Sequence, residues 1–140
     1  MLKITKGLIA DGIMTYTDDE GNKYVRVKVD GQDFCIAPHD YTKGKRYVFP
    51  WKRVMKLTEE VLEQDGISLP TKEQISTYVK YLEDINSELW GIGGSSLKDD
   101  WYWTSTEDDS ENACIYNGES GLFYSSIKVA SFRVRFILNL

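Results

Sequence analysis

The chain has 140 residues, of which 41% are hydrophobic and 28% charged, and its net charge is −5. This length and mix predict one domain, residues 1–140, that can fold without a metal or a disulfide. The acidic balance argues against nucleic-acid binding, which depends on Lys and Arg. The sequence has no apolar run of about 18 residues, so we expect no membrane-spanning helix.

Two features bear on the compartment. Residues 1–7 lack a long apolar core followed by a small-residue cleavage site, so we expect no signal peptide. The protein would then be made in the cytoplasm, and it would stay there or leave by lysis or within a particle such as a virion. The two cysteines, Cys35 and Cys114, can form one bridge or none, and we expect two buried thiols.

Residues 1–46 are expected to form a β-hairpin region. A short strand over 13–16 is followed by a polar turn over 18–22. Residues 23–29 alternate strictly, which is typical of a half-exposed antiparallel strand with Val25, Val27 and Val29 on one face. The pair Asp30-Gly31 predicts a two-residue hairpin turn, and residues 32–37 form the returning strand.

Two helices follow. The first is predicted over 50–65, with Pro50 at its first position. Gly66 ends it and a short extended segment follows. Thr71 and Gln74 make a capping box for a second helix over about 72–90. The second helix carries one apolar stripe, formed by Ile75, Val79, Leu82, Ile85 and Leu89.

The C-terminal part returns to β structure. Four strands are predicted, over 101–105, 112–117, 122–128 and 131–138. The last strand alternates cleanly, with apolar side chains on one face and Arg133 and Arg135 on the other. The order is a β-hairpin, two helices and an antiparallel β-meander, so the sequence predicts an α+β fold.

Three groups of residues could carry chemistry but match no complete motif. The glycine run at 91–96 lacks the Gly-Lys-Ser/Thr of a phosphate-binding loop. The acidic residues between 99 and 111 could bind Ca²⁺, but their spacing fits no EF-hand, and we expect a solvated acidic rim. His39 is the only histidine and has no neighbouring Cys-x-x-Cys. We therefore expect no metal, no cofactor and no catalytic residue.

The aromatic run Trp101-Tyr102-Trp103 points instead to recognition. Neighbouring residues of a strand face opposite sides, so Trp101 and Trp103 share one face and Tyr102 takes the other. If Trp103 is in the core, we expect at least one of the three side chains to be partly exposed. Tyr116, Phe123 and Tyr124 could extend this group into a binding face.

Three segments resemble the Lcl C-terminal domain family and the bacterial major-paralogous domains. Residues 47–56, Tyr-Val-Phe-Pro-Trp-Lys-Arg-Val-Met-Lys, are similar to the helix opening of that family. Residues 66–73, Gly-Ile-Ser-Leu-Pro-Thr-Lys-Glu, resemble its Gly-x-Arg-Leu-Pro-Thr-x-Glu signature, although Ser68 replaces the Arg. Residues 101–107 resemble its Tyr-Trp-Ser-Ser-Thr-Glu strand, and the match covers about 47–138.

The resemblance implies a C-type-lectin-like fold over 47–140, with loops that display a ligand surface. It favours a non-enzymatic recognition or surface-display domain that binds a glycan or protein, as adhesins and phage receptor-binding tips do. The binding loops would be 91–100, 107–112 and 117–121. The site residues expected from these loops and the aromatic strand are Trp101, Tyr102, Asp108, Asn112, Tyr116 and Asn117.

Two other functions remain open. The chain could be a structural subunit that decorates a capsid or tail and forms a homo-oligomer through its N-terminal hairpin. It could also be an enzyme of the formylglycine-generating type, which would need Cys35 and Cys114 as reactive thiols.

Overall fold

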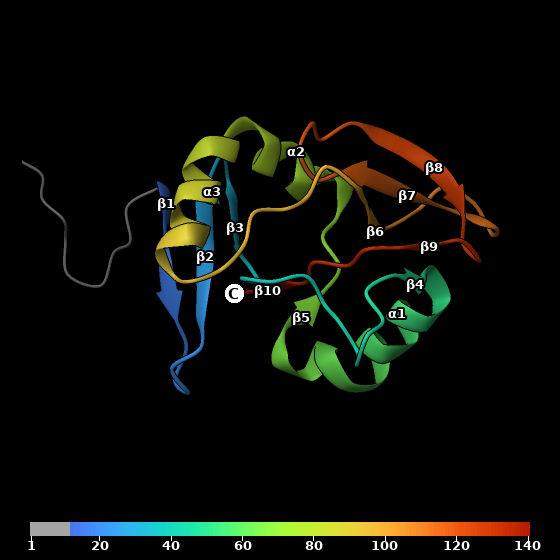
Figure 1. Ribbon diagram of the computed structural model, residues 1–140, viewed down its shortest axis with the longest axis horizontal. Coiled ribbons are helices and arrows are strands. Elements are labelled where there is room, and N and C mark those ends of the chain that lie inside the picture. The colour runs from blue at the N-terminus through green and yellow to red at the C-terminus, as the bar shows by residue number, and fades with distance from the viewer. Residues whose placement is uncertain (1–11) are drawn as a thin grey trace, which may run out of the picture.

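The computed structural model describes residues 12–140, and its elements form an α+β fold with antiparallel sheets (Figure 1). Residues 1–7, on which the expectation of no signal peptide depends, lie outside the described part. Among the helices of 12–140, none has the length and apolar character that crossing a bilayer requires.

A five-stranded sheet has the order β1-β2-β3-β10-β5. Its strands are β1 (Gly12–Thr17), β2 (Lys23–Val29), β3 (Gln32–Ile36), β10 (Ile137–Asn139) and β5 (Ile67–Ser68). The predicted hairpin is confirmed as β2–β3, because Asp30 and Gly31 both have positive φ, at 52° and 77°, as a two-residue turn of this kind requires. The three alternating valines of β2 are buried. Since β10 occupies the free edge of β3, the hairpin is part of the core.

The first helical segment changes type along its length. It begins as α1 (Trp51–Leu57), continues as a π-helical turn (Thr58–Leu62) and ends as a 3₁₀ turn (Glu63–Asp65). Gly66 ends it in the left-handed region at φ 77°, as predicted. Pro50 lies one position before the helix in extended backbone, so its predicted place inside the helix is wrong. The wider π turn rotates the apolar face, which leaves Val61 half exposed.

The second predicted helix is two helices. Thr71 and Gln74 form the expected capping box at the start of α2 (Lys72–Lys80). The chain leaves helical geometry at Tyr81, with φ −121° and ψ 28°, and continues as α3 (Leu82–Gly91). The Tyr81 hydroxyl lies 3.3 Å from the carboxylate of Asp30, in the β2–β3 turn. The break thus coincides with a contact to a distant segment, which helical periodicity cannot reveal.

A three-stranded antiparallel sheet contains β6 (Trp101–Glu107), β7 (Asn112–Asn117) and β8 (Phe123–Ile127). The sheet lies between two hydrophobic clusters. Tyr102 and Tyr116 enter the first cluster, together with α2, α3 and the five-stranded sheet. Trp103 and Ile115 enter the second, together with α1 and the C-terminal segment. Alternate residues of one sheet therefore support both halves of the core.

The C-terminal segment connects all the sheets, and the single predicted strand over 131–138 is wrong. It pairs first as β9 (Ser131–Phe132) with β4 (Phe49–Pro50) and finally as β10 with β3 and β5. Between them, Arg133 exchanges backbone hydrogen bonds with β6, and the carbonyls of Val134 and Phe136 accept from the 37–41 loop. Figure 1 shows this red segment crossing the middle of the molecule. The strand is interrupted because its partners change.

Candidate recognition surface

The six predicted site residues do not gather at one place. Trp101 and Asn117 face each other at one end of the β6–β7 ladder. Asp108 and Asn112 lie in the turn at its other end. The ladder separates these two groups, so they cannot contact one small ligand together.

Tyr102 and Tyr116 are not surface residues, which corrects their assignment to the binding site. They are 0% and 1% exposed and stack on each other, with ring centroids 5.3 Å apart. Burial raises the pKa of both phenols. The Tyr102 hydroxyl donates to Asp40 at 2.9 Å and accepts from the Lys98 N–H. Because side chains alternate along β6, Tyr102 faces the first cluster, and its hydroxyl forms hydrogen bonds inside the protein rather than with a ligand.

The two asparagines close turns. The side-chain oxygen of Asn117 accepts from the N–H groups of Glu119 and Ser120, and its NH₂ donates to Asp99 at 3.0 Å. The side chain of Asn112 donates to Asp109 in the other turn.

Asp109, the neighbour of the predicted Asp108, organises the turn over 107–112. One of its carboxylate oxygens accepts from the N–H groups of Glu111 and Asn112. These bonds, the one from Glu111 first, hold the pKa of Asp109 below its usual value. Asp108 is exposed. Outside the turn, Lys128 donates from Nζ to the Glu107 carboxylate and the Ser110 carbonyl.

Trp101 is the predicted aromatic residue that is partly exposed. It packs edge-to-face with Tyr124 of β8, with ring centroids 5.1 Å apart. Tyr124 is 59% exposed, and Leu122 just before β8 is 60% exposed. The strand registers place the three residues on the side of the sheet that also carries Trp103 and Ile115. We call Trp101, Leu122 and Tyr124 the aromatic platform.

A charged group borders the platform. Nε of Arg133 donates to Asp100 at 2.7 Å, and its guanidinium lies 4.7 Å from the ring centroid of Tyr47, which is half exposed. Burial acts to raise the pKa of Asp100, but the hydrogen bonds from Arg133 and the Trp101 N–H outweigh it and hold the pKa below its usual value. Asp100 is thus a carboxylate at neutral pH. Trp, Tyr and Arg are the residue types enriched in recognition surfaces.

Arg135 connects the 37–41 loop and the 91–100 loop to the C-terminal segment through hydrogen bonds. Its side chain is 2% exposed, and its Nε donates to Asp40 at 2.8 Å. Its terminal nitrogens donate to the carbonyls of Ala37, Ser95 and Ser96 and to the Ser95 hydroxyl. One buried guanidinium therefore joins the 37–41 and 91–100 loops to the C-terminal segment. Charge-assisted bonds of this kind are the stronger hydrogen bonds in proteins.

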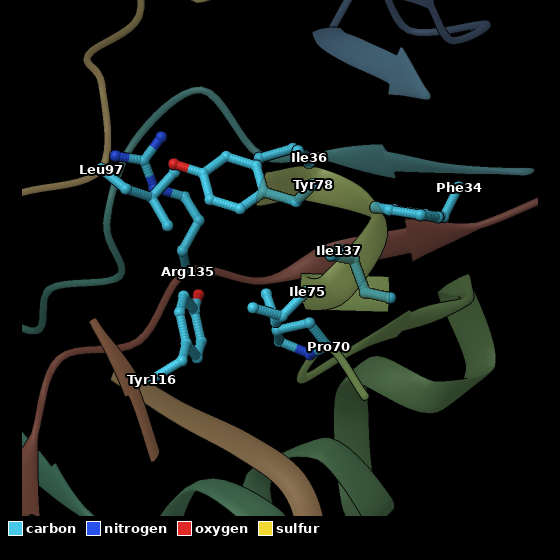
Figure 2. A pocket seen from close by; sticks show the side chains of 9 residues that line it. All are labelled: Phe34, Ile36, Pro70, Ile75, Tyr78, Leu97, Tyr116, Arg135 and Ile137. Carbon is cyan, nitrogen blue, oxygen red and sulfur yellow. The ribbon is translucent and has the colours of Figure 1, made fainter. Parts of the chain in front are cut away.

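The cavity beside Arg135 is not a substrate pocket. Figure 2 shows the guanidinium at the hydroxyl end of Tyr78, with Tyr116 on the opposite side of the arginine stem. The lining is otherwise apolar and the free volume is about 10 Å³. This is room for about one water molecule.

His39, Cys35 and Cys114 are the side chains that the catalytic alternatives considered above would use. Nδ1 of His39 lies 3.5 Å from the Ser95 hydroxyl, which also accepts from Arg135. Cys35 and Cys114 are buried free thiols in different sheets. Burial raises the pKa of Cys35 to about 12 and also raises that of Cys114, which makes both poor nucleophiles. Within residues 12–140, no three His, Cys, Asp or Glu side chains converge as metal ligands.

Sequence reasoning missed the part played by Leu122, Arg133 and Arg135. Only one signal could have indicated the two arginines, which is their alternation with Phe132, Val134 and Phe136. A charged residue at every second position of an apolar strand must either face water or find a buried partner.

No family model matches this chain, and no curated protein matches it.

Proposed function

We propose that the protein is a non-enzymatic recognition or surface-display domain whose contact surface is the aromatic platform. The observation that carries the proposal is the Trp101–Tyr124 pair, in which Trp101 is partly exposed and Tyr124 is 59% exposed, bordered by the Arg133–Asp100 ion pair. The rings offer apolar contact area with little rotamer entropy to lose. The ion pair offers planar donors and acceptors for a sugar hydroxyl or a peptide group.

The scaffold supports this role. Trp101 lies on β6, which packs in both clusters, and Tyr124 lies on β8, whose Phe123 packs against the first. Sites on strands are held more firmly than sites on loops. The buried thiols Cys35 and Cys114, with raised pKa values, disfavour the thiol-dependent enzyme alternative. We further propose that the fold is C-type-lectin-like and that the protein acts in a phage or prophage virion. The order of hairpin, helices and small sheet and the three family-like segments support this reading.

A printed glycan array and a pull-down from bacterial envelope extract test the proposal, both with the full chain. The test variant is the double substitution Trp101→Ala/Tyr124→Ala. The matched control is Trp90→Ala, because Trp90 is 67% exposed but belongs to α3. We expect one array or one extract to give binding that the double variant loses at least about tenfold and the control keeps. Binding that survives in the double variant would move the contact surface elsewhere, and no binding in either experiment would contradict recognition.

A second function, assembly, is favoured by a different observation, the open edge of β8. In the N-terminal hairpin region, which was first considered for this role, β10 covers the outer edge of β3, and β1 is an edge strand of the five-stranded sheet.

A further inference from the structure

The outer edge of β8 carries unpaired backbone groups. Two hydrogen bonds to β7, from Asn117 N–H to the Leu122 carbonyl and from Lys128 N–H to the Glu111 carbonyl, show which residues of this segment face inward. Because antiparallel pairing alternates, the N–H and C=O groups of residues 123, 125 and 127 point away from β7. Of these groups, the Ile127 carbonyl accepts from the Ala130 N–H. In the described part of the chain, no partner binds the other five.

This edge also lacks the features that usually prevent strands from pairing between molecules. Residues 122–130 contain no proline, and their one charged side chain, Lys128, turns inward. Lys128 is 4% exposed, forms an ion pair with Glu107 and lies 4.6 Å from the Trp51 ring centroid. Ile127 and Val129 are 55% and 77% exposed. An open, uncharged and apolar edge strand is a template for another strand.

The geometry favours a second copy of the chain as the partner. The outward groups of residues 123, 125 and 127 are symmetric about Ser125. A second β8 running antiparallel would place Ser125 opposite the partner's Ser125 and Phe123 opposite the partner's Ile127. Both of these pairs consist of outward-facing residues, so both are hydrogen-bonded pairs of a regular antiparallel ladder. A shift of one residue would place backbone groups that point away from β7 opposite partner groups that point toward β7, which could not form hydrogen bonds. The register centred on Ser125 avoids this mismatch.

We propose that the protein forms a homodimer in which β8 pairs antiparallel with β8 of a second copy, about a twofold axis that passes midway between the two Ser125 residues. The pairing joins two three-stranded sheets into one of six strands. Each exposed Ile127 then packs against the partner's Phe123, and the pairing residues bring no like charges together, although each chain carries −5. Such an interface uses the same patch on both copies, as twofold dimers do.

The dimer bears on recognition without depending on it. The twofold axis is perpendicular to the sheet, so both aromatic platforms lie on the same face of the six-stranded sheet. Tyr124 projects from that face opposite the partner's Ser126, so its ring stays accessible. Two sites on one face would allow bivalent attachment to a repetitive surface.

Charge substitutions at Ser125 test the twofold axis directly. Ser125 is exposed, and Ser125→Lys and Ser125→Glu each place like charges opposite each other in the dimer. By sedimentation equilibrium, we expect the unaltered chain to be dimeric, each variant to dissociate at least about tenfold more readily, and an equimolar mixture of the two to recover the dimer. Ser125→Ala is the control and should remain dimeric.

A backbone substitution gives an independent result. Ser125→Pro removes an N–H that faces away from β7, so the dimer should be lost while the monomer still folds, with the same urea midpoint as the monomeric Ser125→Lys variant. A monomeric unaltered chain would overturn the proposal. So would a dimer that both charge variants leave intact, or a mixture that stays monomeric. Glycan or envelope binding by a monomeric Ser125→Lys variant would show that recognition is separate from pairing.

Discussion

Replacing Arg135 by Met tests whether one buried guanidinium holds the loops behind the platform. The substitution keeps most of the apolar stem and removes five hydrogen bonds. It leaves the carbonyls of Ala37, Ser95 and Ser96 without these donors. It also leaves Asp40, which is 9% exposed, without its nearest cation.

Removing one partner of a buried ion pair costs about 3–5 kcal/mol. We expect the lower end, about 3 kcal/mol, because Asp40 still accepts from the Tyr102 hydroxyl at 2.9 Å and keeps Arg133 at 3.5 Å. Since a domain of this kind has about 5–15 kcal/mol in total, the loss is a large share of the free energy of unfolding. Urea unfolding followed by tryptophan fluorescence measures it.

Arg26→Met is the matched control. Arg26 makes a two-bond contact with Asp33, but the two side chains are 13% and 36% exposed, compared with 2% and 9% for Arg135 and Asp40. Exposed pairs contribute about 0–1 kcal/mol. The reasoning is refuted if Arg135→Met costs no more than Arg26→Met. Hydrogen exchange should rise in the 37–41 and 91–100 loops in the first variant only.

Three further predictions concern the scaffold. Gly121→Ala should lower stability by about 1–3 kcal/mol in thermal unfolding, because φ is +73° and the added methyl group meets Val79; unchanged stability would contradict that packing. The hydrogen bond from Arg26 lowers the pKa of Asp33, so this contribution to stability is present above the ordinary value of 3.8 and lost as pH falls through the lowered pKa. The stability difference between the unaltered chain and Asp33→Asn should therefore shrink in acid, and urea midpoints at two pH values show whether it does. Cys35 should react with a thiol reagent at neutral pH only as fast as the protein unfolds, and immediate labelling would show that the thiol is not buried.

The sequence predicted correctly those secondary-structure elements that are specified by residues close together in the chain. The valine alternation and Asp30-Gly31 specify the β2–β3 hairpin, and Thr71 with Gln74 specifies the start of α2. These signals depend on neighbours within four residues. The same holds for Gly66, where a left-handed residue ends the first helical segment.

The features that sequence missed depend on distant contacts. Nothing near Tyr81 interrupts a helix, and the break coincides with a contact to Asp30. The C-terminal segment alternates like one strand, but its partners change from β4 to β6, then to the 37–41 loop and finally to β3.

The candidate site was predicted in part for a related reason. Alternation showed that Trp101 and Tyr102 face opposite sides, but not which side is buried. The order of the sheets decides this, since both sides of β6 meet a hydrophobic cluster and only the two ends of the strand reach the surface. Tyr102 therefore stacks in the core on Tyr116.

The most direct test of the central claim is ligand binding by the platform variant. The Trp101→Ala/Tyr124→Ala chain and the Trp90→Ala chain are compared with the unaltered protein on the same glycan array and envelope extract, after circular dichroism confirms that both are folded. The account predicts that binding falls at least about tenfold in the first chain and is unchanged in the second. Equal binding by all three chains would show that the aromatic platform is not the recognition surface.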